Sequence, residues 1–299
     1  MTLRPRYRSG SPAVAYLFIA PALVAIGIFF VVPIVAAFMM SFTDFDIYAL
    51  GSLTFVRFVA LENYLRALDA PLFWQAIRNT FYFVLVGGPL SVAVSLGIAL
   101  MVNSRLARFK SFFRTIYFLP VVTSLVAVAI VWRYVYHPRA GLLNYVLSFF
   151  GVSPVDWLGN PDMAMPAIIL LAVWKNFGYN MLIFIAGLQN IQDDLYDAAR
   201  IDGAGVWKQF LNVTVPMLAP TTVFIVVITV IGYFQLFAEP YVMTQGGPLN
   251  STLSLVMLMY EQGFRWWSMG YAASIAFLLF LIILVFTAIQ IFLRRRALV

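Results

Sequence analysis

The sequence predicts an all-α integral membrane protein with six transmembrane helices and with both termini in the cytoplasm. Of its 299 residues, 63% are hydrophobic and only 10% are charged, and the mean hydropathy is +0.92. A soluble domain is roughly half apolar and about one-quarter charged, so most of this chain is expected to face lipid. The apolar stretches give the number of helices, and the basic residues give their orientation.

Six stretches are apolar and long enough to cross a membrane, which takes about 20 residues in a helix because every backbone polar group must bond within the helix. They lie at approximately 14–40, 80–102, 115–136, 165–188, 217–238 and 271–293. Residues 1–13 form a basic tail, and residues 14–299 form one transmembrane domain. The first stretch is long enough to tilt or to kink at Pro33. The apolar piece 141–152 is too short to span and is expected to lie flat at the membrane interface.

Basic residues predict the orientation, because they concentrate in connections on the cytoplasmic side. With six crossings, the tail, the second and fourth connections and the C-terminal end share one side. Their basic residues are Arg4, Arg6, Arg8, Arg105, Arg108, Lys110, Arg114, Arg200, Lys208, Arg294, Arg295 and Arg296. Both termini are therefore expected in the cytoplasm. This distribution accounts for the net charge of +7, which gives no support to nucleic-acid binding.

The composition also excludes several kinds of site. Cysteine is absent, and the single histidine, His137, stands alone next to Pro138. Disulfides, thiolate metal sites, cysteine nucleophiles and HExxH-type metal sites are therefore excluded. We predict no catalytic and no metal-binding residues. A G-x-x-x-x-G-K-[ST] stretch for ATP phosphates is also missing, so the chain is expected to bind no cofactor of its own.

The connection between the fourth and fifth spans, residues 190–215, predicts a compact helix–turn–helix on the cytoplasmic surface. Asp193 or Asp194 is suited to cap a short helix, and Asp197 is expected in its first turn, where the helix dipole favours an anion. Gly203 then breaks this helix, because glycine tolerates a positive φ. A second short helix follows, and Pro216 and Pro220 open the fifth span.

Within this connection, Asp197-Ala198-Ala199 and Asp202-Gly203-Ala204 resemble the EAA loop of type I ABC importer permeases. In that family the first helix of the loop docks into a groove on a cytoplasmic ATPase and transmits its closure to the spans. The resemblance implies that the ATPase-coupling residues are Asp197, Ala198, Ala199, Asp202, Gly203 and Ala204. This chain has Asp197 where the family usually has glutamate, which keeps the charge and shortens its reach.

Other segments resemble the carbohydrate-uptake branch of the same family, in particular its MalF-like or UgpA-like member. The segment Phe58-Val59-Ala60-Leu61-Glu62-Asn63-Tyr64 is similar to the pattern F-V-G-L-x-N-Y, and Thr244-Gln245-Gly246-Gly247-Pro248 also matches. Further matches are Phe113-Arg114-Thr115, Leu119-Pro120, Gly141-Leu142-Leu143-Asn144 and Trp157-Leu158-Gly159. Together these segments follow the family's order along nearly the whole chain.

The resemblance implies a non-enzymatic permease subunit of the bacterial cytoplasmic membrane, which imports a sugar or a sugar-like solute by alternating access. The implied partners are a second, MalG-like permease, a cytoplasmic ABC ATPase dimer that holds ATP and Mg, an extracytoplasmic solute-binding protein and the lipid bilayer. The binding protein is expected to dock on the outer loops near Asn63 and Thr244–Pro248.

Polar residues on the fourth and fifth spans predict a substrate path. The spacing places Lys175 near Tyr179 and Asn176 near Asn180 on one polar stripe of the fourth span. Hydroxyl-rich ligands need donors, acceptors and an aromatic surface. The predicted path residues are Lys175, Asn176, Tyr179, Asn180, Thr229, Tyr233 and Glu239.

These side chains have a structural alternative, since polar residues in bundles often hydrogen-bond between helices. A lysine in a span costs roughly 2.5–3.5 kcal/mol on insertion scales, so Lys175 should face the interior or water. It is expected either to pair with Glu239 or with an acid of a partner subunit, or to meet an anionic substrate such as a glycerol phosphate.

Two other classes of protein compete with this interpretation. A stand-alone secondary transporter or channel would carry acids inside its spans, together with broken helices and an internal repeat. An intramembrane enzyme would need a nucleophile–base pair or metal ligands in a span. The spans contain almost no acids, and with no cysteine and one histidine the enzyme interpretation has poor candidates.

Overall fold

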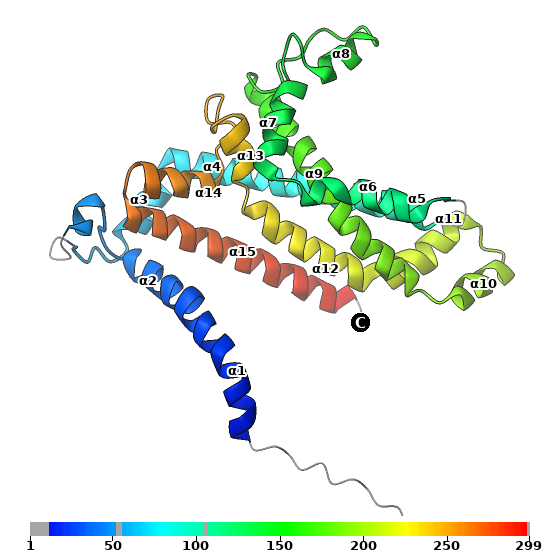
Figure 1. The fold of residues 1–299 in the computed structure, drawn as a ribbon, viewed down its shortest axis with the longest axis horizontal. Coiled ribbons are helices and arrows are strands. Elements are labelled where there is room, and N and C mark those ends of the chain that lie inside the picture. Colours follow the sequence, from blue (N-terminus) through cyan, green and yellow to red (C-terminus); the bar gives the residue numbers. More distant parts are fainter. Residues whose placement is uncertain (1–11, 52–55, 105–106, 298–299) are drawn as a thin grey trace, which may run out of the picture. The chain divides into compact units, whose positions relative to one another are not determined.

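The computed structural model describes residues 12–51, 56–104 and 107–297. These residues are almost entirely helical, and the only β pairing among them is the isolated bridge between Thr43 and Phe58 (Figure 1). The chain divides into two compact units, Met1–Ala67 with Gln262–Phe277, and Leu68–Glu261 with Leu278–Val299.

Among the described residues, five apolar helical segments are long enough to cross a membrane, which confirms the all-α membrane fold class. They are Tyr16–Met40, Pro71–Asn103, Pro161–Gln189, Val206–Phe234 and Met269–Phe292. The longest helices are α9 (Pro161–Gln189) and α15 (Met269–Ala297). The number of spans rises to six if two further helices, Lys110–Val122 and Leu125–Val135, together form one bent span.

The third predicted span, 115–136, is wrong as a single helix. It is built from α6 (Lys110–Val122) and α7 (Leu125–Val135), which meet at an angle of 97°. Pro120 lies inside α6 and lacks an N–H, so the helix loses a hydrogen bond there. Thr123 and Ser124 then adopt extended backbone, with ψ of 150° and 126°. The break follows from this proline and the two extended residues after it.

The fifth span also differs from the prediction at its outer end. Its helix α12 (Val215–Phe234) stops at Phe234 and not near residue 238, because Gln235 and Phe237 leave the helical conformation. A separate short helix, α13 (Ala238–Met243), follows the break. At the other end, α11 (Val206–Gln209) continues into the span instead of standing apart from it.

Three helical segments contain a π-helical turn that ends two residues before a proline. A proline ring clashes with the carbonyl group four residues earlier, and in each case that carbonyl lies inside the wider turn. The turn therefore lets the helix continue through the proline, and Pro33 is accommodated in this way within the first span. The turns and the following helices are η1 (Gly27–Val31) with α2 (Val32–Met40), η4 (Phe83–Gly87) with α5 (Gly88–Asn103), and η5 (Phe210–Thr214) with α12.

The remaining helical segments either begin one of the spans or are short. The expected helix within 141–152 is present as α8, although its position relative to a membrane stays a prediction. The segments are α1 (Pro12–Ile26), η2 (Ile47–Leu50), α3 (Glu62–Asp69), α4 (Pro71–Tyr82), α8 (Leu142–Ser148), α10 (Asp193–Ile201), α14 (Leu255–Tyr260) and η6 (Glu261–Arg265).

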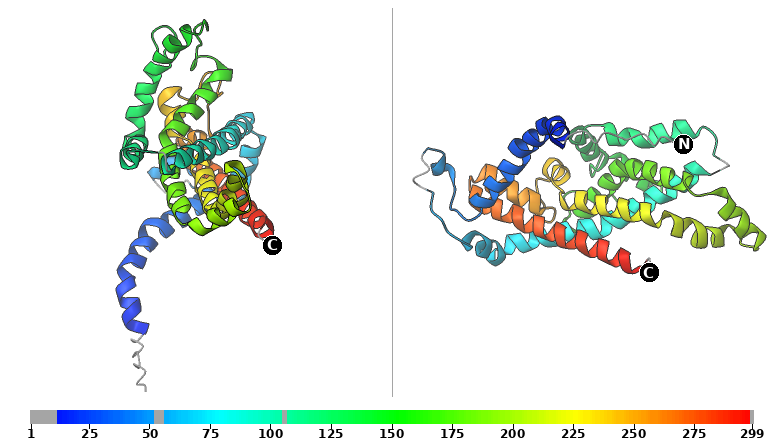
Figure 2. Two further views of the ribbon diagram at one scale, coloured as in Figure 1. Left: turned by 90° about the vertical axis from the view of Figure 1, so that its right-hand side faces the viewer. Right: turned by 90° about the horizontal axis from the view of Figure 1, so that it is seen from below.

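In the second unit, α9 is the most buried of the spans and packs against α5, α6 and α12. Their contact is apolar, with Ala99, Met181, Phe184 and Leu218 among the buried side chains. The connection between α5 and α6 lies at the same end of these helices as α10 and α11 (Figures 1 and 2). The two connections that are predicted to be cytoplasmic therefore occupy one end.

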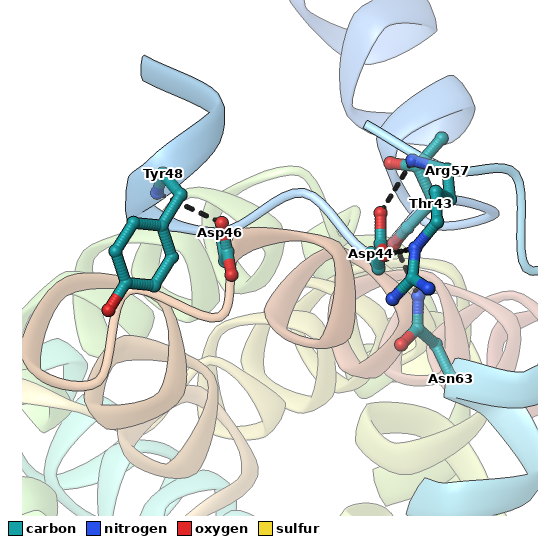
Figure 3. Close-up of polar contacts among 6 residues, drawn as sticks. All are labelled: Thr43, Asp44, Asp46, Tyr48, Arg57 and Asn63. Carbon is teal, nitrogen blue, oxygen red and sulfur yellow. Dashed lines mark hydrogen bonds and ion pairs between the residues drawn. The ribbon is translucent and has the colours of Figure 1, made fainter. Parts of the chain in front are cut away.

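In the first unit, the motif of residues 58–64 closes the end of the first span (Figure 3). The Asn63 amide donates to the carbonyl oxygens of Ser41 and Thr43, at 3.0 and 2.8 Å, which satisfies carbonyls that a helix end leaves unpaired. Asp44 accepts from the Arg57 backbone N–H at 2.6 Å and pairs with its guanidinium at 2.8 Å. These contacts hold the pKa of the Asp44 carboxyl below its usual value.

A glycine at the crossing of α6 and α9 gives a stability prediction. A Cβ added at Gly178 would overlap the carbonyl oxygen of Tyr117 and lie 3.1 Å from Cα of Phe118. Because both are backbone atoms, Gly178→Ala should cost about 1–3 kcal/mol by forcing the helices apart. The control is Gly97→Ala, since an added Cβ at Gly97 meets nothing within 4 Å. Thermal unfolding in detergent should show a lower midpoint for Gly178→Ala alone, and equal midpoints would contradict the close crossing.

Candidate functional site

A cavity of about 640 Å³ opens between α9 and α12, with part of its wall supplied by α6 and α7. Every predicted path residue except Lys175 lines it, so the structure brings together side chains that are up to 63 positions apart, from Asn176 to Glu239. The lining residues are Phe83, Val121, Leu125, Asn176, Tyr179, Asn180, Ile228, Thr229, Gly232, Tyr233, Gln235, Leu236, Phe237, Ala238 and Glu239.

The polar part of the cavity is built by side chains that also connect the helices. The Asn180 amide donates to the Thr229 hydroxyl at 3.0 Å, linking α9 to α12. The Asn176 amide donates to the carbonyl oxygen of Ala172, one turn earlier on α9. The interhelical alternative therefore describes the Asn180–Thr229 pair, although both side chains also face the cavity. Tyr179 is half exposed on the same helix.

Aromatic rings form the rest of the wall. The Tyr233 ring stacks on Phe83, with ring centroids 4.8 Å apart, and both residues line the cavity. Phe83 was not among the predicted path residues. It lies in the second span, and its polar neighbours at helical spacing, Asn79 and Thr80, bond to residues 250–255 and not to the cavity. The sequence therefore carries no signal that distinguishes Phe83 from a lipid-facing phenylalanine.

Lys175 has a structural role in this arrangement. Its side chain is buried, at 7% exposure, and its ammonium donates to the carbonyl oxygen of Val121 at 3.0 Å. Val121 lies in the last turn of α6, where a carbonyl has no intrahelical partner and the helix dipole favours a cation. Among the described residues, Lys175 forms no ion pair with Glu239. Of the alternatives for Lys175, a direct ion pair with Glu239 is therefore not formed in this structure.

Glu239 contributes the one acidic side chain among the lining residues. It lies in α13, after the break that ends the fifth span, and it is nine-tenths buried. Burial raises the pKa of its carboxyl, and the positive charge of Lys175 opposes this shift in part. The cavity thus combines amides, hydroxyls, aromatic rings and one carboxyl group with a raised pKa.

Residues 190–215, the coupling segment, form the predicted helix and turn, but two details of the helix differ from the prediction. The helix α10 is capped by Gln192 without a side-chain hydrogen bond, so Asp193 and Asp194 lie in its first turn instead of capping it. Asp197 lies one turn later than expected and pairs with Arg200 at 2.6 Å. Both differences arise because the helix begins at Asp193. Asp197 is therefore its fifth residue and lies beyond the first turn.

The turn after α10 confirms the expected glycine break. Gly203 has a φ of +74°, and its N–H bonds to the Arg200 carbonyl at 3.0 Å. The Ala204 N–H bonds to the Ala199 carbonyl at 2.8 Å. This pair of bonds is the Schellman motif that closes many helices at a glycine.

The exposed surface of this segment has a polar part and an adjacent apolar part. Asp197, Ala198, Asp202 and Gly203 are exposed, whereas Ala199 and Ala204 are half-buried. Next to them, three large apolar side chains are strongly exposed. A patch of this kind is typical of a protein–protein contact. The apolar residues are Ile201 at 87%, Val206 at 85% and Trp207 at 69% exposure.

The coupling segment is tied to the fifth span by side chains. The Tyr196 hydroxyl on α10 hydrogen-bonds the Thr214 hydroxyl at 2.9 Å, directly before α12 begins. Trp207 stacks on Phe210, with ring centroids 5.4 Å apart. The same helical segment then runs on to the cavity residues Thr229 and Tyr233. The helix that lines the cavity is therefore continuous with the segment to which α10 is bonded.

The fold and the site together define a membrane permease that carries an exposed coupling helix and no nucleotide-binding loop of its own. Residues 91–299 match the family described as binding-protein-dependent transport system inner membrane component, and the chain belongs to this family. This family match, together with the similarity of the chain to curated sugar permeases, confirms the resemblance to carbohydrate ABC importer permeases.

The chain is similar to curated permeases over most of its length. It is 38% identical to the arabinooligosaccharides transport system permease protein AraP of Bacillus subtilis, over 93% of this chain and 88% of the relative. It is 36% identical to the lactose transport system permease protein LacF of Rhizobium radiobacter, over 94% and 93%. A chain of a bacterial alginate ABC transporter has the same fold, with a TM-score of 0.82, 21% identity and coverage of 95% and 94%.

The Lys175–Val121 hydrogen bond gives a second prediction. Lys175→Met keeps the length of the side chain and removes the charge that caps α6, whereas Lys175→Arg keeps a cation with donors. Breaking one partner of a charged hydrogen bond costs about 1.5–3 kcal/mol. Lys175→Met should therefore lower the thermal unfolding midpoint and slow solute uptake, and Lys175→Arg should restore most of both. A Lys175→Met protein with wild-type stability would contradict the capping role.

Proposed function

We propose that this chain is the MalF-like permease subunit of an ATP-binding-cassette importer, and that it carries an uncharged or weakly charged oligosaccharide, disaccharide or polyol into the cytoplasm. The observation that supports this most is the cavity, where amides and hydroxyls lie next to the Tyr179 and Tyr233 rings. Sugars bind to surfaces of this composition, since their hydroxyls need paired donors and acceptors and their C–H faces pack on aromatic rings.

The names of similar proteins agree with this substrate class. Besides the arabinooligosaccharide and lactose permeases, the chain is 34% identical to the trehalose/maltose transport system permease protein MalF of Thermococcus litoralis, over 97% of this chain. These names belong to the relatives, and they support a sugar as the solute here. The glycerol-phosphate alternative receives less support, because Lys175 is engaged with Val121 and the cavity lining holds a carboxyl group and no basic side chain.

The energy in this proposal comes from partner chains. An ABC ATPase dimer, which binds ATP and Mg, docks on the exposed face around Asp197, Ala198 and Gly203, and a second, MalG-like permease completes the path. A binding protein delivers the sugar at the outer loops near Asn63 and Thr244–Pro248. In the bacterial cytoplasmic membrane, the tail, α10 and the C-terminal end then face the cytoplasm. Nucleotide binding on the partner biases the equilibrium between inward and outward states.

The test uses the chain co-expressed with the candidate partner proteins that are encoded beside it. ATP hydrolysis and uptake are measured in proteoliposomes with and without the binding protein and candidate sugars. One sugar, with its binding protein, should stimulate both activities. Uptake that needs an ion gradient and no ATPase would overturn the proposal in favour of a secondary transporter.

The coupling role is tested in the same assay with a pair of glycine variants. Gly203→Ala introduces a side chain at a φ of +74°, a conformation that costs roughly 1–2 kcal/mol for other residues, so the turn after α10 should relax. Sugar-stimulated hydrolysis should fall at least about 5-fold, which a distortion of this size permits. Gly205→Ala is the control, because Gly205 has a φ of −69° and open space around it. Equal stimulation in the two variants would contradict a coupling role for this turn.

A further inference from the structure

Two buried hydroxyl groups beside the cavity have no hydrogen-bond partner among the described residues. One belongs to Ser91 on α5, which is 0% exposed, and the other to Tyr233 on α12, which is 6% exposed. A buried hydroxyl without a partner is unfavourable, and native proteins keep few of them. Their neighbour Ser95 is equally buried, but its hydroxyl donates to the Ser91 carbonyl oxygen at 2.6 Å. The unpaired state thus distinguishes Ser91 and Tyr233 from the equally buried Ser95.

The packing of α5 against α12 brings the two hydroxyls to one place. Phe83, Gly87 and Ser91 follow one another at intervals of four residues, on one face of η4 and α5. The Tyr233 ring stacks on Phe83, and a Cβ added at Gly87 would lie 2.8 Å from its Cε1 atom. Gly87 therefore leaves the space through which the ring passes.

Polar groups from three helices meet at the Tyr233 hydroxyl. The side chains of Ser91 on α5 and Asn176 on α9 lie close enough to interact with it, yet its geometry toward them makes no hydrogen bond. Asn176 and Tyr233 both line the cavity, whereas Ser91 is fully buried and is not among the lining residues. The cluster is therefore continuous with the cavity and extends it toward α5.

We propose that Ser91 and Tyr233 form a polar subsite that binds one hydroxyl group of the transported sugar, and that Gly87 is the positioning residue for the Tyr233 ring. This inference rests on the proposed function. Both hydroxyls are closed to solvent in this conformation, so the sugar reaches them when α5 and α12 separate during the transport cycle. A hydroxyl group both donates and accepts, so one sugar hydroxyl pairs with both side chains at once.

The direct variants are Ser91→Ala and Tyr233→Phe, each of which removes one unpaired oxygen and keeps the packing. Because no hydrogen bond is lost, the thermal unfolding midpoint should stay the same or rise. Sugar uptake per ATP hydrolysed should fall about 3- to 10-fold, the effect of one missing neutral hydrogen bond. The double variant should lose more than either single variant, because both bonds to the same sugar hydroxyl are then missing. Ser95→Ala, the matched control one turn away, should transport at the wild-type rate.

A second pair of variants tests the positioning role. Gly87→Ala should displace the Tyr233 ring and reduce uptake, whereas Gly97→Ala on the same helix should not, because an added Cβ there meets nothing within 4 Å. Replacing Tyr233 by Phe should make uptake insensitive to Gly87→Ala if the ring position matters only through its hydroxyl.

The decisive comparison uses monodeoxy analogues of the transported sugar, with the binding protein loaded to saturation. One analogue should lose uptake in the wild type by the same factor as the double variant Ser91→Ala/Tyr233→Phe, and it should lose nothing further in that double variant. If the loss from every analogue instead adds to the loss from the variant, no sugar hydroxyl pairs with these side chains. A water molecule or the helix packing alone then accounts for them, and the inference is overturned. So would wild-type uptake by Ser91→Ala. A wild type that takes up no sugar defeats the proposed function, and this inference with it.

Discussion

The structure depends on one constraint, which is that a polar group inside a lipid-facing bundle must find its partner within the protein. The broken third span shows how this is met. Where α6 stops at Val122, the Lys175 ammonium reaches from α9 to the Val121 carbonyl. The same contact satisfies a buried lysine and a helix end, and it places Val121 and Leu125 in the cavity wall. At the C-terminal end of the first span, Asn63 performs the equivalent task for two other carbonyls.

A continuous helix connects the coupling segment to the cavity. The segments α11, η5 and α12 form one uninterrupted helix. Little irregular backbone therefore lies between α10 and the cavity that could absorb a displacement of α10. The Tyr196–Thr214 hydrogen bond enters that segment at its start, and Thr229 and Tyr233 lie near its end. A rigid connection of this kind suits a subunit whose energy is supplied by another chain, since it transmits a displacement without a nucleotide site of its own.

Much of this arrangement was predictable from the sequence. Hydropathy and basic residues gave the spans and the shared end of the two basic connections, and the i, i+4 spacing on α9 together with polar residues on α12 gave most of the cavity. The 97° break was not predicted, since an apolar run with Pro120 is compatible with a kinked helix as well as a broken one. The Lys175 contact depends on that break, and Phe83 and Ser91 join the site only through the packing of α5. Local patterns carry no information on such tertiary contacts, whereas Gly203 was predictable because its constraint is local.

The central claim is that the face of α12 toward α9 lines a water-filled path for the solute. The chain contains no cysteine, so an introduced cysteine is its single labelling site, and the transporter assembled with the wild-type chain measures the background from the partner chains. Ile228→Cys lies on the cavity wall, and Val226→Cys, two residues away, lies in an apolar pocket between α5, α12 and α15. A membrane-impermeant thiol reagent should modify Ile228→Cys and not Val226→Cys, and the transported sugar with its binding protein should slow the reaction. Equal labelling of both positions, or labelling of Val226→Cys alone, would contradict the account.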